Sequence, residues 1–166
     1  MKKLNFGCRG KFLKGWVNVD IQKGNGVDKS FDFNEFPYPF KDNTFDYVLV
    51  DEILEHLDDP KKVLNELWRI CKSNATMRIV VPYCHCLSAF NDIEHKHYFN
   101  MRTITLLVHP KRDYKLKSGG KFSIVKLDLL PTRLGKLVQP RELRNAVSKV
   151  FGNICGRVEA VLKVIK

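Results

Sequence analysis

The stretch Leu4-Asn5-Phe6-Gly7-Cys8-Arg9-Gly10, followed by Trp16-Val17-Asn18-Val19-Asp20, decides the fold of this chain. It predicts a short apolar strand, a tight glycine turn and a second strand that ends on an acidic residue. A glycine in the turn lets the backbone come close to a ligand. A carboxylate at the end of the next strand can accept hydrogen bonds from both hydroxyls of a ribose. This order of elements favours a site for a nucleoside-type cofactor.

The rest of the chain alternates between expected strands and helices, which favours an α/β sheet with parallel pairing. The clearest buried strand is 45–50, because its nearly continuous apolar character is typical of parallel sheets. Asp59-Pro60 is a good helix start, as N-cap and first helical residue, and we expect this helix to end at Ser73-Asn74. The other expected elements are strands at 27–33, 76–81, 123–130 and 157–165, and a helix after Gln139-Pro140 that carries Leu143, Ala146, Val147, Val150 and Phe151.

The expected strand 123–130 has alternating side chains. Val125, Leu127 and Leu129 fall on one face, and Lys126 and Asp128 fall on the other. The alternation predicts a half-buried strand with the three apolar residues inside.

Length and composition predict an ordinary globular protein. The 166 residues are enough for a substantial core, and we expect a single domain over 1–166. No apolar run reaches the roughly 20 residues of a membrane span, and the N-terminal sequence has no apolar signal segment. The five cysteines are odd in number and do not suggest a disulfide framework. We therefore expect a reducing, cytoplasmic setting.

The positive charge of the chain is concentrated in its second half. The net charge is +11, and residues 91–166 hold 16 Lys and Arg against 6 Asp and Glu. The densest part is 109–117, which continues to Lys121 and includes Tyr114. This asymmetry predicts an anionic partner such as RNA or acidic lipid, because lysines meet phosphates and aromatic rings stack on bases. A solvated loop is the alternative, and no recognised RNA-binding signature accompanies the segment.

The chain resembles class I S-adenosylmethionine-dependent methyltransferases over about residues 3–103, and most closely the compact prokaryotic proteins of the methyltransferase type 11 group. The matching segments are LNFGCRG (4–10), GWVNVDI (15–21), VDKSFDFNEFPYPFKDNTFDYVLVDEILEHLDDPKKVLNELWRICK (27–72), MRIVVPY (77–83) and HKHYF (95–99). The resemblance implies a doubly wound, mostly parallel, Rossmann-like sheet of seven strands with helices on both faces and an antiparallel C-terminal strand.

The resemblance also implies S-adenosylmethionine as the cofactor and a role for individual residues. The implied contacts are Gly7 and Cys8 under the methionine part, Asp20 at the ribose hydroxyls, Ile21 against the adenine, Asp32 and Phe33 at the adenine amino group, and Asp51 and Glu52 at the methionine moiety and the substrate opening.

The turn departs from the family at one position. The family usually has Gly-Cys-Gly, and here Arg9 replaces the second glycine, with Gly10 one residue later. If the position needs a positive φ, a side chain there costs about 1 kcal/mol or more. Either the affinity for the cofactor is lower or Gly10 takes over the role. Asp20 follows at the family's spacing, which favours retained binding.

Two histidines are candidate catalytic residues. Methyl transfer is an in-line displacement that depends mostly on placing the nucleophile against the methyl group. A hydroxyl or amine nucleophile still benefits from a base, and histidine is the usual choice. His56 follows the strand 45–50, and His95 follows the strand 76–81. The alternative is a capping or packing role for His56 and a structural role for His95.

The sequence also contains a group of potential zinc ligands. Cys84, Cys86, His95 and His97 are ligand types that zinc accepts in tetrahedral geometry. Their spacing is not that of the common zinc knuckles, and the segment matches a family loop that needs no metal. We therefore expect no metal.

The sequence thus predicts a methyltransferase that acts on an oxygen or nitrogen nucleophile, with the substrate entering over residues 83–122. The substrate is expected to be anionic, such as RNA, an acidic small molecule or a glycan. Two alternatives stay open: a non-catalytic binding or partner protein with the methyltransferase fold, and an RNA-binding protein that uses its basic second half.

Overall fold

The computed structural model describes residues 1–109 and 121–166. Most of the basic segment, including Tyr114, therefore lies outside the described residues, as does part of the expected substrate-side segment 83–122. The elements in chain order are β1 (Lys3–Phe6), β2 (Val17–Asp20), β3 (Lys29–Ser30), β4 (Phe45–Asp51), the 3-10 helix η1 (Leu54–His56), α1 (Pro60–Ile70), β5 (Cys71–Pro82), η2 (Leu87–Ala89), α2 (Met101–Val108), β6 (Lys121–Pro131), η3 (Gly135–Leu137), α3 (Arg141–Val147) and β7 (Cys155–Ile165).

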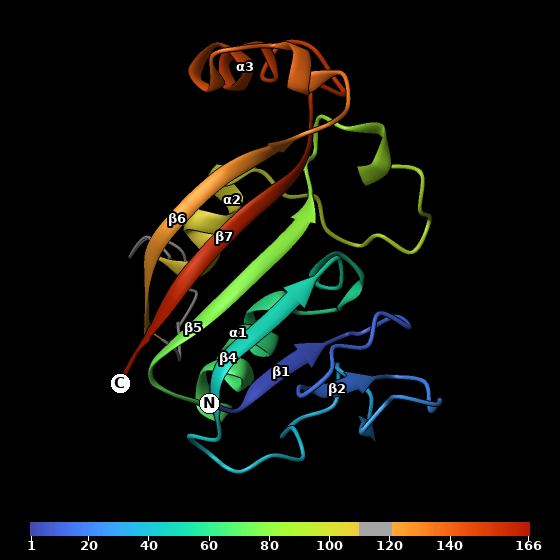
Figure 1. The fold of residues 1–166 in the computed structure, drawn as a ribbon, viewed down its shortest axis with the longest axis vertical. Coiled ribbons are helices and arrows are strands. Elements are labelled where there is room, and N and C mark those ends of the chain that lie inside the picture. Colours follow the sequence, from blue (N-terminus) through green and yellow to red (C-terminus); the bar gives the residue numbers. More distant parts are fainter. Residues whose placement is uncertain (110–120) are drawn as a thin grey trace.

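The strands form one seven-stranded sheet in the order β3-β2-β1-β4-β5-β7-β6 (Figure 1). The pairs from β3 to β5 are parallel. Strand β7 lies between β5 and β6 and is antiparallel to both. The mostly parallel sheet with an antiparallel C-terminal strand is therefore confirmed. Because the parallel strands run the same way, their carboxyl ends meet at one edge, where ligands bind in such sheets.

Helix α1 begins where its local chemistry predicts. The side chain of Asp59 accepts hydrogen bonds from the backbone N–H groups of Lys61 and Lys62, and Pro60 is the first helical residue. In the view of Figure 1, α1 and α2 both pass behind the sheet. The segments that join β1, β2, β3 and β4 contain no helix. The first three strand connections therefore consist of loops.

Strand β5 begins earlier than expected. The helix was expected to end at Ser73-Asn74, but α1 ends at Ile70 and β5 starts at once at Cys71. Cys71 pairs with Phe45 at the start of β4, and Asn74 adopts a φ of +60°. The expectation was wrong because a partner strand, and not the polar run 72–74, determines where this strand starts. The expected strand 27–33 is likewise reduced to the two residues of β3.

Strand β6 departs from simple alternation. Its register with β7 shifts between Ile124 and Lys126, which marks a bulge. Val125 lies in the bulge and is 61% exposed, while Asp128 is buried. The expected inward position of Val125 was wrong, because an extra residue in a bulge reverses the inside and outside positions around it.

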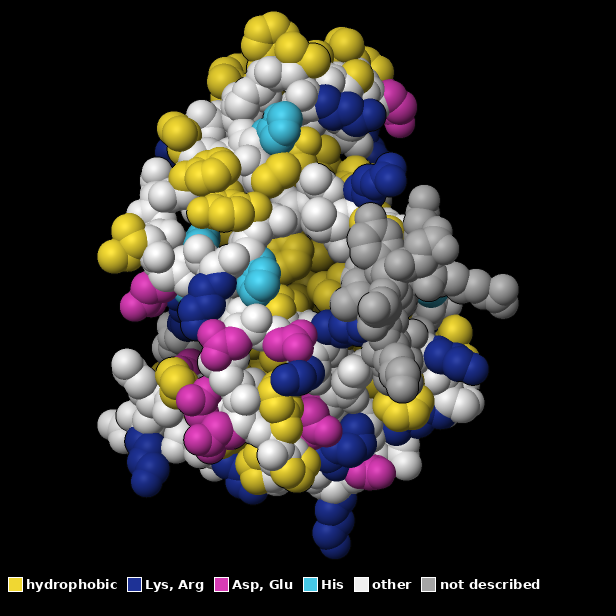
Figure 2. All heavy atoms as spheres, turned by 180° about the vertical axis from the view of Figure 1, so that it is seen from behind, with side chains coloured by type: hydrophobic (Ala, Val, Ile, Leu, Met, Phe, Trp, Pro, Cys, Tyr) yellow, Lys and Arg dark blue, Asp and Glu magenta, His cyan; other side chains and the backbone are white. Residues whose placement is uncertain are grey.

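The end of the molecule that carries α3 is unusually apolar on its surface. Helix α3 ends at Val147, so it is shorter than expected, and its neighbours Val150 and Phe151 lie outside it. Leu137, Leu143, Val150 and Phe151 are all at least half exposed. Hydrophobic side chains gather at this end in Figure 2. Among the described residues, no helix has the length and apolar character to cross a bilayer.

Candidate functional site

The turn after β1 is tied to the end of β2 by backbone hydrogen bonds. The N–H groups of Gly7 and Cys8 both donate to the carbonyl oxygen of Val19 at 3.0 Å. The N–H of Arg9 donates to Oδ2 of Asp20 at 2.7 Å. The turn and the acidic residue are therefore held together as one unit at the carboxyl edge of the sheet.

The backbone of this turn is left-handed at three residues. Gly7 has a φ of +74°, Arg9 of +42° and Gly10 of +75°. A Cβ atom at Gly7 would lie 2.8 Å from Cγ1 of Ile53, whereas a Cβ at Gly10 would meet nothing within 4 Å. Arg9 thus occupies a conformation that favours glycine, and its side chain costs about 1 kcal/mol there. Position 7 requires a glycine for two reasons, the positive φ of the backbone and the close approach of Ile53.

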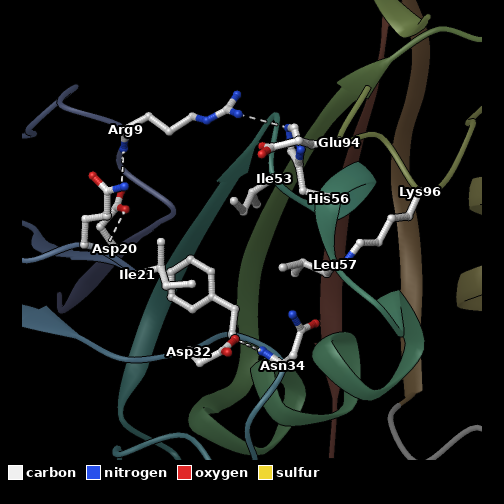
Figure 3. A pocket seen from close by; sticks show the side chains of 12 residues that line it. Arg9, Asp20, Ile21, Asp32, Asn34, Ile53, His56, Leu57, Glu94 and Lys96 are labelled. Carbon is white, nitrogen blue, oxygen red and sulfur yellow. Dashed lines mark hydrogen bonds between the residues drawn. The ribbon is translucent and has the colours of Figure 1, made fainter. Parts of the chain in front are cut away.

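A cavity of about 570 Å3 opens beside this turn (Figure 3). A volume of this size is typical of small-molecule sites. Side chains from the turn, the end of β2, the segment after β3, the end and flanks of η1 and the segment after β5 surround it. Its lining includes four of the residues expected to bind the cofactor, Asp20, Ile21, Asp32 and Phe33.

The two aspartates of this cavity differ in how they are held. Oδ2 of Asp20 already accepts from Arg9 and from the Cys8 thiol at 3.5 Å, and Oδ1 accepts from the N–H of Gln22 at 3.3 Å. Oδ1 of Asp32 accepts from the N–H of Asn34 at 2.8 Å. A carboxylate has about four acceptor positions, so both side chains keep positions for a ligand.

A second cavity of about 450 Å3 lies on the other side of Arg9. Arg9 lines both cavities, and the segment after β5 contributes to both. The second cavity is lined by Arg9, Glu52, Glu55, Pro82, Ser88, Asn91, Asp92, Ile93 and His95. The arrangement can hold two ligands side by side with Arg9 at their boundary.

The remaining expected cofactor residues take different positions. Cys8 is buried, and burial, with the nearby Asp20, raises the pKa of its thiol. Oδ1 of Asp51 is buried without a hydrogen-bond partner among the described residues. Glu52 has a φ of +53° and lines the second cavity. Gly7, Cys8, Gly10 and Asp51 do not line the larger cavity. The turn supports that cavity through the backbone.

The structure brings the two candidate catalytic histidines together. The ring centroids of His56 and His95 lie 4.7 Å apart in an edge-to-face arrangement. Nη2 of Arg9 donates to Nε2 of His56 at 3.0 Å. Burial lowers the pKa of His56, and the neighbouring Arg9 lowers it further, so this ring is held neutral.

Glu55 is a site residue that the sequence analysis missed. Its side chain is 1% exposed, and neither of its carboxylate oxygens has a hydrogen-bond partner among the described residues. Burial raises the pKa of Glu55 to about 7. Its backbone carbonyl accepts from the N–H groups of Lys96 and His97, which ties η1 to the segment after β5. The available signal was its place next to His56 in the sequence, within the matching segment 27–72.

The metal ligands considered from the sequence do not come together. In the described part of the chain, His95 lies near Glu55 and His56, while Cys84, Cys86 and His97 join no group of potential metal ligands. Nε2 of His97 lies 3.3 Å from the carbonyl oxygen of Asp58 instead.

Comparisons with known proteins agree with this architecture. Residues 16–79 match the model of the methyltransferase domain family. A norajmaline N-methyltransferase of Rauvolfia serpentina is 35% identical over 68 residues, which are 39% of this chain and 23% of that protein. An uncharacterized protein of Methanocaldococcus jannaschii is 51% identical over 43 residues, which are 26% of this chain and 19% of that protein. The matched parts thus span less than a quarter of either relative.

Solved structures resemble the whole fold. A S-adenosylmethionine-dependent methyltransferase from Archaeoglobus fulgidus matches with a TM-score of 0.72 and 18% identity, over 98% of this chain and 85% of that one. A second such enzyme, from Mesorhizobium loti, matches with a TM-score of 0.63 and 10% identity, over 98% and 90% of the two chains. At these identities the likeness shows the fold, and the expected class I methyltransferase fold is confirmed.

Proposed function

We propose that this chain, which matches the methyltransferase domain family over residues 16–79, binds S-adenosylmethionine and transfers its methyl group to an oxygen or nitrogen nucleophile. The observation that carries the proposal is the larger cavity. It lies at the carboxyl edge of the sheet, beside a left-handed turn, with Asp20 and Asp32 in its wall. A nucleoside with a charged amino-acid tail needs such a combination of hydroxyl acceptors and close backbone approach.

The residues of the larger cavity suit the parts of this cofactor. Asp20 would accept from the ribose hydroxyls, and Ile21 and Phe33 would pack against the adenine, beside Asp32. When bound, S-adenosylmethionine supplies an electrophilic methyl group, whose bond to sulfur breaks as the bond to the nucleophile forms and whose electron pair stays on sulfur. The chain contributes mainly by placing the nucleophile in line with that bond.

The second cavity would hold the methyl acceptor, because it shares Arg9 with the first and is lined by His95. Nδ1 of His95 lies 2.8 Å from the carbonyl oxygen of Ala89. A carbonyl only accepts, so Nδ1 carries the proton and Nε2 keeps a free lone pair. Nε2 would take the proton that the nucleophile loses. His56, whose Nε2 accepts from Arg9, would position that arginine.

The lining of the second cavity limits the kind of group that enters it. Three of its side chains are acidic, from Glu52, Glu55 and Asp92, against the single cation of Arg9. We therefore propose that the atom to be methylated is neutral or part of an amine. An anionic part of a larger substrate would contact the basic second half of the chain, outside this cavity.

The five cysteines are all free, which supports a reducing, cytoplasmic setting.

The test is calorimetric titration with S-adenosylmethionine and with its demethylated product. We expect binding by the wild-type chain and at least about a tenfold loss of affinity in Asp20→Asn, which corresponds to about 1.4 kcal/mol. Asp46→Asn is the matched control, because Asp46 pairs with Lys72 at the start of β4 and lines neither cavity. No heat at high micromolar cofactor would leave a non-catalytic protein with this fold as the better description.

A further inference from the structure

Three side chains form a compact cluster at the wall between the two cavities. A carboxylate oxygen of Glu55 and one ring nitrogen each of His56 and His95 lie within 4.8 Å of one another. His56 lines the larger cavity, and Glu55 and His95 line the smaller one. One carboxylate and two imidazoles are a ligand set that divalent transition metals accept.

Glu55 gives an independent indication that the cluster lacks a partner. The side chain is 1% exposed, and both of its oxygens are without a hydrogen bond among residues 1–109 and 121–166. Buried carboxylates are normally paired with a cation or bound to a metal, because an unpaired one is costly to desolvate. The backbone hydrogen bonds from Lys96 and His97 to the Glu55 carbonyl hold the residue in this position.

His95 is oriented as metal-binding histidines are. Its side chain is 6% exposed, and Nδ1 donates to the carbonyl oxygen of Ala89 at 2.8 Å. A hydrogen bond from the far nitrogen to a backbone carbonyl fixes the tautomer and directs the lone pair of Nε2 toward the ligand. The ring of His95 also lies in an edge-to-face arrangement with the ring of His56, with 4.7 Å between the two ring centroids.

The surrounding charges favour a cation. The acids whose charge acts on the cluster are Glu52 and Asp51 beside Glu55, and Asp92 and Glu94 beside His56, and the basic side chain that acts on it is Arg9. The guanidinium of Arg9 now donates to Nε2 of His56. A bound cation would repel this exposed guanidinium, so Arg9 competes with the metal for the cluster.

From these observations we propose that Glu55, His56 and His95 bind a divalent transition-metal cation such as Zn2+. Binding of the metal does not depend on the function proposed above. Its role does rest on that function: at the wall of the smaller cavity the cation would bind the acceptor oxygen or nitrogen and favour its deprotonated form, with the proton released to solvent. In that state the two imidazoles serve as ligands, and the metal replaces a histidine as the means of activating the nucleophile.

The experiment uses the chelator-treated chain and the metal alone as probe. Zn2+ is titrated by calorimetry, and Co2+ by the visible absorption of its bound form. We expect one equivalent of each to bind and Mg2+ not to bind, because imidazole ligands suit transition metals and not Mg2+. The absence of binding by both Zn2+ and Co2+ would overturn the proposal.

Matched variants locate the site. His95→Gln and Glu55→Gln are expected to lose at least about tenfold in affinity for Zn2+. His97→Gln is the control, because His97 is close in sequence but outside the cluster, and it is expected to keep the wild-type affinity. Equal losses in His95→Gln and His97→Gln would contradict the assignment. Thermal unfolding of each variant shows whether the fold is retained.

Arg9→Asn gives a second, opposite change. Asn tolerates the left-handed backbone of this position, but its side chain is short and uncharged. It therefore neither contacts His56 nor repels a cation, and Zn2+ is expected to bind more tightly than in the wild type. Titration with S-adenosylmethionine in chelator is run separately. Loss of cofactor binding with metal binding intact would reject only the proposed function, and the reverse result would reject only the metal site.

Discussion

Nη2 of Arg9 lies 3.0 Å from Nε2 of His56, so the turn after β1 is joined to η1 across the boundary between the two cavities. Figure 3 shows the arginine side chain extending from the turn toward the histidine ring. The residue that departs from the glycine pattern of related turns is therefore part of the site through its side chain as well as its backbone.

Substitutions at Arg9 separate backbone strain from the side-chain contact. Arg9→Ala loses the contact but keeps a Cβ at a φ of +42°, whereas Arg9→Gly loses both. We expect Arg9→Gly to be more stable to unfolding than Arg9→Ala by about 1 kcal/mol, measured by denaturant titration. Because the bond to Asp20 is made by the backbone, Arg9→Gly should also retain cofactor binding. A more stable Arg9→Ala would show that the turn relaxes out of the left-handed region.

Gly7 and Gly10 form a matched pair for testing close packing in the turn. Both have a φ near +75°, but only a Cβ at Gly7 collides with Ile53. Gly10→Ala is expected to cost about 1 kcal/mol and Gly7→Ala about 2 kcal/mol or more. Since Ile53 lines the larger cavity, Gly7→Ala should weaken cofactor binding as well. Equal stabilities of the two variants would rule out the steric argument.

The buried carboxylate of Glu55 is predicted to reduce the stability of the metal-free protein. In metal-free protein at a pH above 7, where a carboxyl group with a pKa of about 7 is mostly ionised, Glu55→Gln should raise the free energy of unfolding by about 1 kcal/mol or more, because it removes an unpaired buried charge. Glu52→Gln is the control, because its side chain is 33% exposed and its ion pair with Arg157 is long, at 3.9 Å, so it should change stability little. A destabilised Glu55→Gln would mean that the carboxylate has a partner in solution.

The loop that supports the larger cavity is predicted to be sensitive to acid. Burial raises the pKa of Glu66, but hydrogen bonds from Arg69 and from the N–H of Tyr38 outweigh it, so the net pKa is lowered. Arg69 also donates to the carbonyl of Tyr38, whose hydroxyl donates to the carbonyl of Phe33 in the cavity wall.

A lowered pKa in the folded state determines the direction in which stability changes with pH. The stability due to Glu66 is fully present above its unfolded pKa of about 4.3 and is lost as the pH falls through the lower folded value. Glu66→Gln should therefore be less stable than wild type at pH 7, and the difference should shrink toward pH 3. Denaturant unfolding across this range measures it, and a constant difference would exclude the carboxylate of Glu66 as the cause.

Local chemistry made some elements predictable and left others out of reach. The strand at Phe45 and the helix start at Asp59 follow from apolar runs and capping, which act within a few residues. The start of β5 at Cys71 and the bulge at Val125 depend on the partner strand, so the sequence pattern missed them.

The residues of the candidate site also divide into those that local sequence predicts and those that depend on distant contacts. The turn residues were found because they lie at the end of a recognisable strand, and His56 and His95 were found because they follow the strands β4 and β5 in the sequence. The burial of Glu55 was not found, because it requires the segment after β5 to fold back over η1, as the hydrogen bonds from the N–H groups of Lys96 and His97 to the Glu55 carbonyl show. Such contacts are between residues far apart in the sequence, and no local pattern contains them.

The position of Arg9 has a thermodynamic consequence for any pair of ligands. Its N–H holds Asp20 in one cavity, and its side chain forms a wall of both. A ligand that moves this side chain changes the binding free energy of a ligand in the other cavity. The two affinities are then linked, and each ligand must alter the dissociation constant of the other by the same factor. A single exposed arginine thereby couples two binding equilibria.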